Sequence, residues 1–205
     1  MIFQIPGLVV NIRKPEISDT STISMWLASS EYLENVGGRP DMPQKFYENQ
    51  VRDMLQENAN DYSNKKFFVA VDRASGNTIA LAILSKIDWR NRHAEFTYII
   101  GDENFKMSLV SGDVNIILYN FFFHNMNMHK IYGYVFAPNA RAHRLNSFGG
   151  RLDGVLKKHK LAAGHATDMH VYSLTKTEFN IFVNKYADSL LKRHVSRGLI
   201  KCLVE

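Results

Sequence analysis

The sequence holds a single cysteine, Cys202, among its 205 residues. One cysteine excludes an internal disulfide framework and a cysteine-based zinc cluster, and it is typical of proteins from a reducing compartment. Long apolar runs are missing as well, since none approaches the roughly 18 residues that a membrane-spanning helix requires. The first ten residues lack the basic stretch and the small-residue cleavage site of a secretory signal. We therefore expect a soluble, cytoplasmic protein with no membrane partner.

An excess of one charge is also missing. Twenty-five Lys and Arg against twenty Asp and Glu give a net charge of +5. This small excess suits an anionic cofactor or substrate but falls short of the basic footprint of a nucleic-acid-binding protein, so we expect no nucleic-acid partner. Hydrophobic residues make up 45% and charged residues 22%, which excludes a disordered tail or a collagen-like repeat.

The length is typical of one or at most two domains, and no internal repeat or low-complexity tract divides the chain. We expect a main domain over residues 1–176 and a C-terminal helical extension over residues 177–205 that packs on or beside it. The apolar side of the helix expected over residues 177–197 consists of Phe179, Phe182, Val183, Leu190 and Leu191.

Hydrophobic periodicity predicts helices and strands in an α+β order. We expect strands over residues 8–12, 66–72, 78–87 and 93–100, a helix that begins at Ser18-Asp19-Thr20, and a second helix over residues 46–58. Residues 93–100 alternate strictly, which places Glu95, Thr97 and Ile99 on one face of their strand.

The pattern of apolar residues in the second half of the chain predicts a helix that connects two parallel strands. An apolar stripe over residues 110–126 indicates a helix, and residues 130–136 indicate the next strand, so strands 93–100 and 130–136 should be parallel. A short helix over residues 139–148 and a hairpin of residues 151–161 and 166–174 follow. The expected fold is a mixed, mostly antiparallel central sheet with one parallel βαβ crossover and flanking helices.

Four segments carry a likeness to a known family. They are residues 29–40 (SSEYLENVGGRP), residues 94–100 (AEFTYII), residues 139–146 (NARAHRLN) after a strand that begins in MHKIY, and residues 168–174 (DMHVYSL). In this order and with these gaps they resemble the GCN5-related N-acetyltransferases (GNAT), specifically the ribosomal-protein-alanine and amino-sugar acetyltransferase branch. The likeness extends from Ile12 to Lys176, about four fifths of the chain.

The resemblance implies that acetyl-CoA is the acyl donor and lies in a wedge between strands 93–100 and 130–136. Its pyrophosphate would rest on backbone amides of the loop that leads into the crossover helix, a loop that the family builds with glycines because a β-carbon hinders close approach. The implied cofactor residues are Ile99, Ile100, Lys106, Ser108, Leu109, Val110, Ser111, Gly112, Asn139 and Arg144.

This loop departs from the family pattern. Leu109 stands where glycine is expected, and Ser111 stands where glycine or alanine is expected. Three interpretations stay open: the loop binds CoA with altered geometry, it serves a different acyl carrier, or it no longer binds. Ser108 and Ser111 also have an interpretation as helix caps.

Direct acetyl transfer requires a neutral amine, and an amine with a pKa of about 10.4 is only ~0.04% neutral at pH 7. A base or a water chain must therefore remove a proton. Glu95 is the candidate base, and the alternative is a solvated or ion-paired strand residue. Asn139 is the candidate holder of pantetheine or of an ordered water, and the alternative is a helix N-cap.

The general acid is an open question. Asn146 stands where many relatives carry a tyrosine that is thought to protonate the departing thiolate, and an amide is no acid at neutral pH. That role is vacant, left to solvent, or filled by another residue. Tyr98, Tyr132 and Tyr172 are the candidates, with packed sheet aromatics as the alternative.

The acceptor is expected to contact residues from the early helices, the sheet and the last hairpin, namely Glu31, Tyr32, Tyr98, His159 and Tyr172. Eight histidines are present, but their spacing matches no metal site, so we expect no metal.

The favoured function is acetyl-CoA-dependent N-acetylation of a primary amine, by direct transfer, on a small molecule such as an amino sugar or on a peptide N-terminus. Two alternatives stay open: a non-catalytic member that binds or regulates, and an acyltransferase with an acyl carrier protein as donor. A homodimer is compatible with the sequence.

Overall fold

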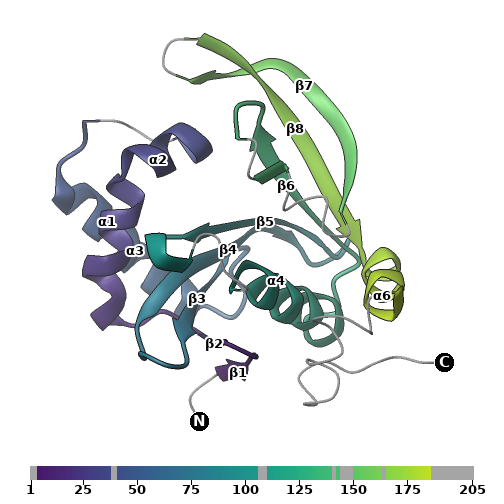
Figure 1. Ribbon diagram of the computed structural model, residues 1–205, viewed down its shortest axis with the longest axis horizontal. Coiled ribbons are helices and arrows are strands. Elements are labelled where there is room, and N and C mark those ends of the chain that lie inside the picture. The colour runs from purple at the N-terminus through teal and green to yellow at the C-terminus, as the bar shows by residue number, and fades with distance from the viewer. Residues whose placement is uncertain are drawn as a thin grey trace.

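The fold is organised around an eight-stranded sheet with the order β1-β2-β3-β4-β5-β6-β8-β7 (Figure 1). The structure is a computed structural model that describes residues 4–37, 41–105, 110–139, 142–143, 150–162 and 165–185. The strands are β1 (Gln4–Pro6), β2 (Val10–Arg13), β3 (Lys66–Asp72), β4 (Thr78–Asp88), β5 (His93–Ile100), β6 (Lys130–Phe136), β7 (Arg151–Ala162) and β8 (His165–Thr175).

The helical elements lie on both faces of this sheet (Figure 1). They are η1 (Ile17–Asp19), α1 (Thr20–Ala28), α2 (Ser30–Tyr32), η2 (Leu33–Gly37), α3 (Gln44–Ala59), η3 (Glu103–Phe105), α4 (Val110–Asn120), η4 (Phe121–Asn125) and α6 (Lys176–Lys185). Among the described helices, none combines the length and the apolar character needed to cross a membrane.

The sheet is mixed, as the sequence predicts. The neighbouring strands β5 and β6 are parallel, and the crossover helix α4 connects them in the chain. The remaining pairs in the described part of the chain are antiparallel. The strands predicted over residues 66–72, 93–100 and 130–136 are confirmed with the same bounds. The α+β expectation is therefore confirmed.

The first strands differ from the prediction. The strand expected over residues 8–12 begins instead at Val10, and a short strand, β1, precedes it. The carboxylate of Asp113, on α4, accepts hydrogen bonds from the backbone N–H groups of Leu8, Val9 and Val10, at 3.1, 2.7 and 3.0 Å. A side chain more than a hundred residues away thus holds this turn, and local periodicity could not reveal it.

The start of α1 is predicted correctly, but the role of its capping cluster is different. The Asp19 carboxylate does not cap α1; it accepts two hydrogen bonds from the Arg13 guanidinium at 2.7 and 3.0 Å and one from Thr78 at 2.6 Å. A bidentate pair of this kind is stronger and more directional than a single contact. Asp19 therefore ties the helix entrance to strands β2 and β4.

Two apolar clusters enclose the sheet. On one face, α1 and α3 supply Ile23, Leu27, Tyr47 and Val51. On the other face, α4 and η4 supply Val114, Ile117, Leu118, Phe122 and Phe123 to a larger cluster. The helix predicted over residues 110–126 changes at Phe121 into the π-helical turn η4.

The C-terminal helix joins the larger cluster through Phe179 and Val183, which are 2% and 5% exposed. It begins at a capping box in which the Thr175 hydroxyl accepts from the Glu178 backbone N–H and the Glu178 carboxylate accepts from the Thr175 backbone N–H. Residues 186–205 lie outside the described residues.

Candidate functional site

β5 and β6 pair over only three residues and then separate. The paired positions are His93 with Lys130, Ala94 with Ile131, and Glu95 with Tyr132. Beyond them, residues 96–100 keep their pairing with β4 but have no strand partner on the other side within the described residues. The sheet therefore opens between β5 and β6 beyond Glu95 and Tyr132.

Gly133 marks the point of separation. A β-carbon on Gly133 would lie 2.8 Å from the backbone oxygen of Phe96, closer than real β-carbons approach. Only glycine lets β6 come this near to β5. An isolated glycine inside a strand often indicates such a close backbone approach, so the sequence carried a usable signal here.

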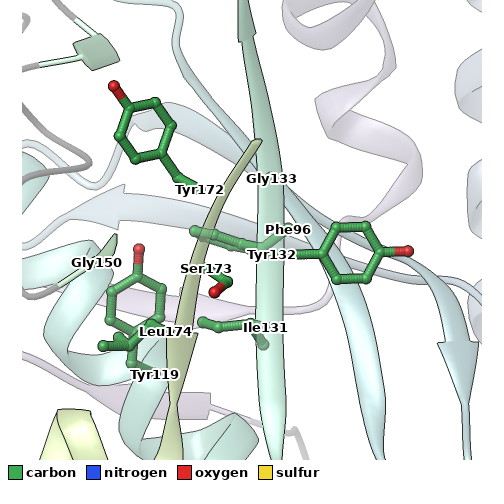
Figure 2. Close-up of a pocket in the computed structure, with 9 residues that line it drawn as sticks. All are labelled: Phe96, Tyr119, Ile131, Tyr132, Gly133, Gly150, Tyr172, Ser173 and Leu174. Atoms are coloured by element: carbon green, nitrogen blue, oxygen red, sulfur yellow. The ribbon is translucent and has the colours of Figure 1, made fainter. Parts of the chain in front are cut away.

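A pocket lies beside this point on the α4 side of the sheet (Figure 2). Its lining residues are Phe96, Tyr119, Ile131, Tyr132, Gly133, Gly150, Tyr172, Ser173 and Leu174. Burial raises the pKa of the Tyr119 phenol, which therefore stays neutral across the physiological range. Figure 2 shows the Tyr132 ring on the opposite side of β6 from Tyr119.

Glu95 lies on that opposite face, at the last paired position of β5. Its Oε2 atom is 2.8 Å from Lys86 Nζ, and the two side chains are 16% and 65% exposed. The hydrogen bond to Glu95 raises the pKa of Lys86. The Lys86 ammonium also lies 5.5 Å from the centre of the Tyr134 ring. Glu95 is thus both a strand residue in an ion pair and a carboxylate beside the separation.

Lys86 reaches Glu95 because β4 bulges. Between Ser85 and Asp88 the register with β5 shifts, and Lys86 has a left-handed backbone with φ of 50°. Such bulges re-aim side chains at functional sites. No sequence period marks this bulge, so the contact between Lys86 and Glu95 could not be predicted.

The predicted cofactor residues are distributed around the α4 side and its edges. Ile100 is buried in the cluster on the α4 face, whereas Ile99 packs against the cluster under α1 and α3. At the start of α4, Val110 and Ser111 are buried and Gly112 is half-buried. The loop residues Lys106, Ser108 and Leu109, and likewise Arg144 and Asn146, lie outside the described residues.

Asn139 follows β6 and acts as a helix cap. Its Oδ1 accepts a hydrogen bond from the Ala142 backbone N–H at 3.0 Å. This is the capping role that the sequence left open. Its role toward pantetheine or an ordered water stays a prediction.

The predicted acceptor residues fall on two faces. Tyr32, on α2, packs on the α1 and α3 side, where burial raises its pKa, and its neighbour Glu31 is exposed. Tyr98 packs on the α4 side, stacked on Phe96 with ring centres 5.9 Å apart. Tyr172 lines the pocket, and His159 is exposed on β7. The fold therefore does not bring this set to one place.

His143 is a site residue to which the sequence assigned no role. Its ring contacts the Tyr172 hydroxyl and lies 4.6 Å, centre to centre, from the ring of His170.

Across the described ranges, no three His, Cys, Asp or Glu side chains converge in a way that could hold a metal ion.

The chain is similar to known proteins in sequence and in fold. The protein named Uncharacterized N-acetyltransferase p20, from Bacillus licheniformis, is 25% identical over 175 residues, which is 83% of this chain and 94% of that protein. The spermidine N-acetyltransferase of Vibrio cholerae, solved with CoA and spermine, has a TM-score of 0.73 at 22% identity and covers 83% of this chain and 97% of its own.

RimJ of Mycobacterium smegmatis, solved with CoA-disulfide, has a TM-score of 0.73 at 17% identity, with 96% of this chain and 95% of its own covered. At these identities, the two solved structures establish the fold. The acetyltransferase (GNAT) domain family matches residues 12–171, most of the chain. The chain therefore belongs to the GNAT acetyltransferase family, and the protein is an acyltransferase.

Proposed function

We propose that the protein transfers the acetyl group of acetyl-CoA directly to a primary amine, with the donor on the α4 side of the sheet and the amine on the Glu95 side. The observation that carries this proposal is the separation of β5 from β6 immediately beyond Glu95 and Tyr132. A thioester placed at that point is accessible from both faces.

The donor side fits an extended arm that carries amide groups. Beyond Glu95, β5 keeps its register with β4 but is no longer in register with β6 within the described residues, and the amides of pantetheine are suited to lie along such a strand. Two structural relatives contain CoA or CoA-disulfide, which supports the same class of donor here. When bound, acetyl-CoA supplies the activated acetyl group.

The acceptor side supplies a base. Glu95 is 16% exposed and therefore has access to an incoming ammonium group. A carboxylate at this position removes a proton from the amine as the amine attacks, which commonly contributes 10²- to 10⁴-fold to rate. Lys86 and Tyr132 lie beside it and keep the carboxylate in place.

The proposed acceptor is a small molecule such as an amino sugar, or a peptide N-terminus. The spermidine acetyltransferase among the relatives contains spermine, so a polyamine belongs in the same comparison. The positive charge of Lys86 on the acceptor face repels a polycation such as spermine. It therefore favours an amino sugar or a peptide N-terminus as the acceptor.

The test measures release of free CoA with glucosamine, spermidine and a peptide with an N-terminal alanine as acceptors. Acetyl-CoA alone should also stabilise the folded protein, by about 2.7 kcal/mol at 100 times its dissociation constant. Glu95→Gln should lower turnover 10²- to 10⁴-fold with little change in acetyl-CoA affinity.

Two results would contradict the proposal. The first is no stabilisation by millimolar acetyl-CoA, which would favour a non-catalytic role. The second is transfer from an acetylated acyl carrier protein but not from acetyl-CoA, which would assign a different donor. If Glu95→Gln keeps normal turnover, only the assignment of the base fails.

A further inference from the structure

A histidine and a tyrosine without a role in the proposed function are hydrogen-bonded beside the pocket. His143 Nδ1 lies 2.9 Å from the Tyr172 hydroxyl oxygen, and His143 Nε2 lies 3.1 Å from the Phe136 carbonyl oxygen. Because a carbonyl oxygen only accepts, Nε2 carries a hydrogen and donates it to Phe136. Nδ1 is therefore the nitrogen through which His143 can exchange a proton with the phenol.

Tyr172 lies close to the point where the sheet opens. In the register between β6 and β8 it is directly opposite Gly133, the residue in close contact with the Phe96 backbone. Tyr172, Gly133 and Phe96 all line the same pocket (Figure 2). The phenol is thus one strand away from the position where the proposed thioester is attacked, and on the donor side.

The ring of His143 is fixed by its surroundings. Besides its two hydrogen bonds, it packs edge to face against His170, with ring centres 4.6 Å apart. Two ionisable side chains of β8, His170 and Tyr172, therefore face His143, and Phe136 of β6 faces it with its carbonyl group. A ring held on three sides keeps Nδ1 directed at the phenol.

We propose that Tyr172 protonates the departing thiolate and that His143 resupplies the proton, an assignment that rests on the proposed function. When the carbon–sulfur bond breaks, its electron pair stays on sulfur. The Tyr172 O–H gives its proton to that sulfur, and protonated His143 gives its Nδ1 proton to the Tyr172 oxygen. His143 then takes a proton from solvent, which balances the proton that the amine loses on the Glu95 side.

The test compares the wild type with Tyr172→Phe and His143→Gln, and with Tyr62→Phe as the control. Tyr62 is 93% exposed in the turn after α3, far along the chain from every site residue. Tyr172→Phe should lower kcat about 10²-fold, and His143→Gln should lower it less, while KM for acetyl-CoA stays near its wild-type value.

A second acetyl donor shows whether Tyr172→Phe loses activity because proton transfer is lost or because the structure is disturbed. With 4-nitrothiophenyl acetate, the departing thiolate is a much weaker base than the CoA thiolate and needs little protonation. The deficit of Tyr172→Phe should then shrink to less than about tenfold. Circular dichroism and melting temperature establish whether each variant is folded.

An equal deficit with both donors would overturn the assignment, because a structural defect does not depend on the leaving group. A deficit in KM alone, or none at all, would also overturn it. If the wild type transfers no acetyl group to any amine, the proposed function fails and this assignment fails with it. If the wild type is active and Tyr172→Phe matches it, only this assignment fails.

Discussion

Lys86 Nζ lies 2.8 Å from Glu95 Oε2, although Lys86 must adopt a left-handed backbone, with φ of 50°, to make this contact. The bulge in β4 places both groups on one face of adjacent strands. An ion pair with one exposed partner contributes about 1 kcal/mol, and a left-handed backbone costs a residue with a β-carbon about 1 to 2 kcal/mol. The backbone of Lys86 therefore offsets much of the stability that the ion pair contributes.

Two substitutions of Lys86 separate the effect of the ion pair on stability from the effect of the left-handed backbone. Lys86→Met and Lys86→Gly both remove the ammonium, but only glycine relieves the left-handed backbone. We expect Lys86→Gly to be more stable than Lys86→Met by about 1 kcal/mol in urea denaturation. If Lys86→Met is the more stable variant, the bulge does not strain the backbone of Lys86.

Gly133→Ala should disturb the point where β5 and β6 separate. The added β-carbon would meet the Phe96 carbonyl oxygen at 2.8 Å, so one strand must shift. A misplacement of this size near reacting groups lowers turnover by about 10- to 100-fold. Gly154→Ala on β7 is the matched control, because nothing lies within 4 Å of its added carbon. Equal activity of the two variants would show that the close approach is unimportant.

Asp113→Asn should destabilise the protein. The Asp113 carboxylate is 1% exposed and accepts hydrogen bonds from three backbone N–H groups at residues 8–10. An amide presents only one oxygen, so at least one buried donor loses its charged acceptor, at a cost of about 1 to 3 kcal/mol. Asp61→Asn, at an exposed turn, is the control for the lost charge. Urea midpoints of the two variants give the comparison.

Asp153 should make stability depend on pH in the acidic range. Hydrogen bonds from Lys130 and Ser173 hold the pKa of its carboxyl far below the ordinary value of 3.8. A lowered pKa in the folded state contributes stability that is complete above pH 3.8 and is lost as the pH falls below it. The wild type should therefore exceed Asp153→Asn in urea midpoint at pH 7.

This difference should narrow between pH 4 and pH 2, because the unfolded chain takes up the proton before the folded protein does. Asp61→Asn again provides the reference for the loss of a carboxylate, measured over the same pH range. A difference that grows toward low pH would contradict the assignment of Asp153.

The sequence alone determined the strands at the centre of the sheet, over residues 66–72, 93–100 and 130–136, and the two faces of the strand over residues 93–100. Strict alternation over residues 93–100 predicted a strand with Glu95 on one face, and the structure has that strand with the same bounds. Helical spacing after residue 110 predicted the crossover and hence the parallel pair. Both signals are local, because the period of the apolar residues follows directly from backbone geometry.

Tertiary structure decided which groups meet. The turn at residues 8–10 depends on the Asp113 carboxylate. The contact of Lys86 with Glu95 depends on a bulge in β4. His143 contacts Tyr172, which lies 29 positions away in the chain. None of these contacts has a sequence period, since each arises from strand register and helix placement that only the packed core fixes. The sequence therefore determined the central strands and the crossover helix, whereas long-range packing determined which side chains meet at the site.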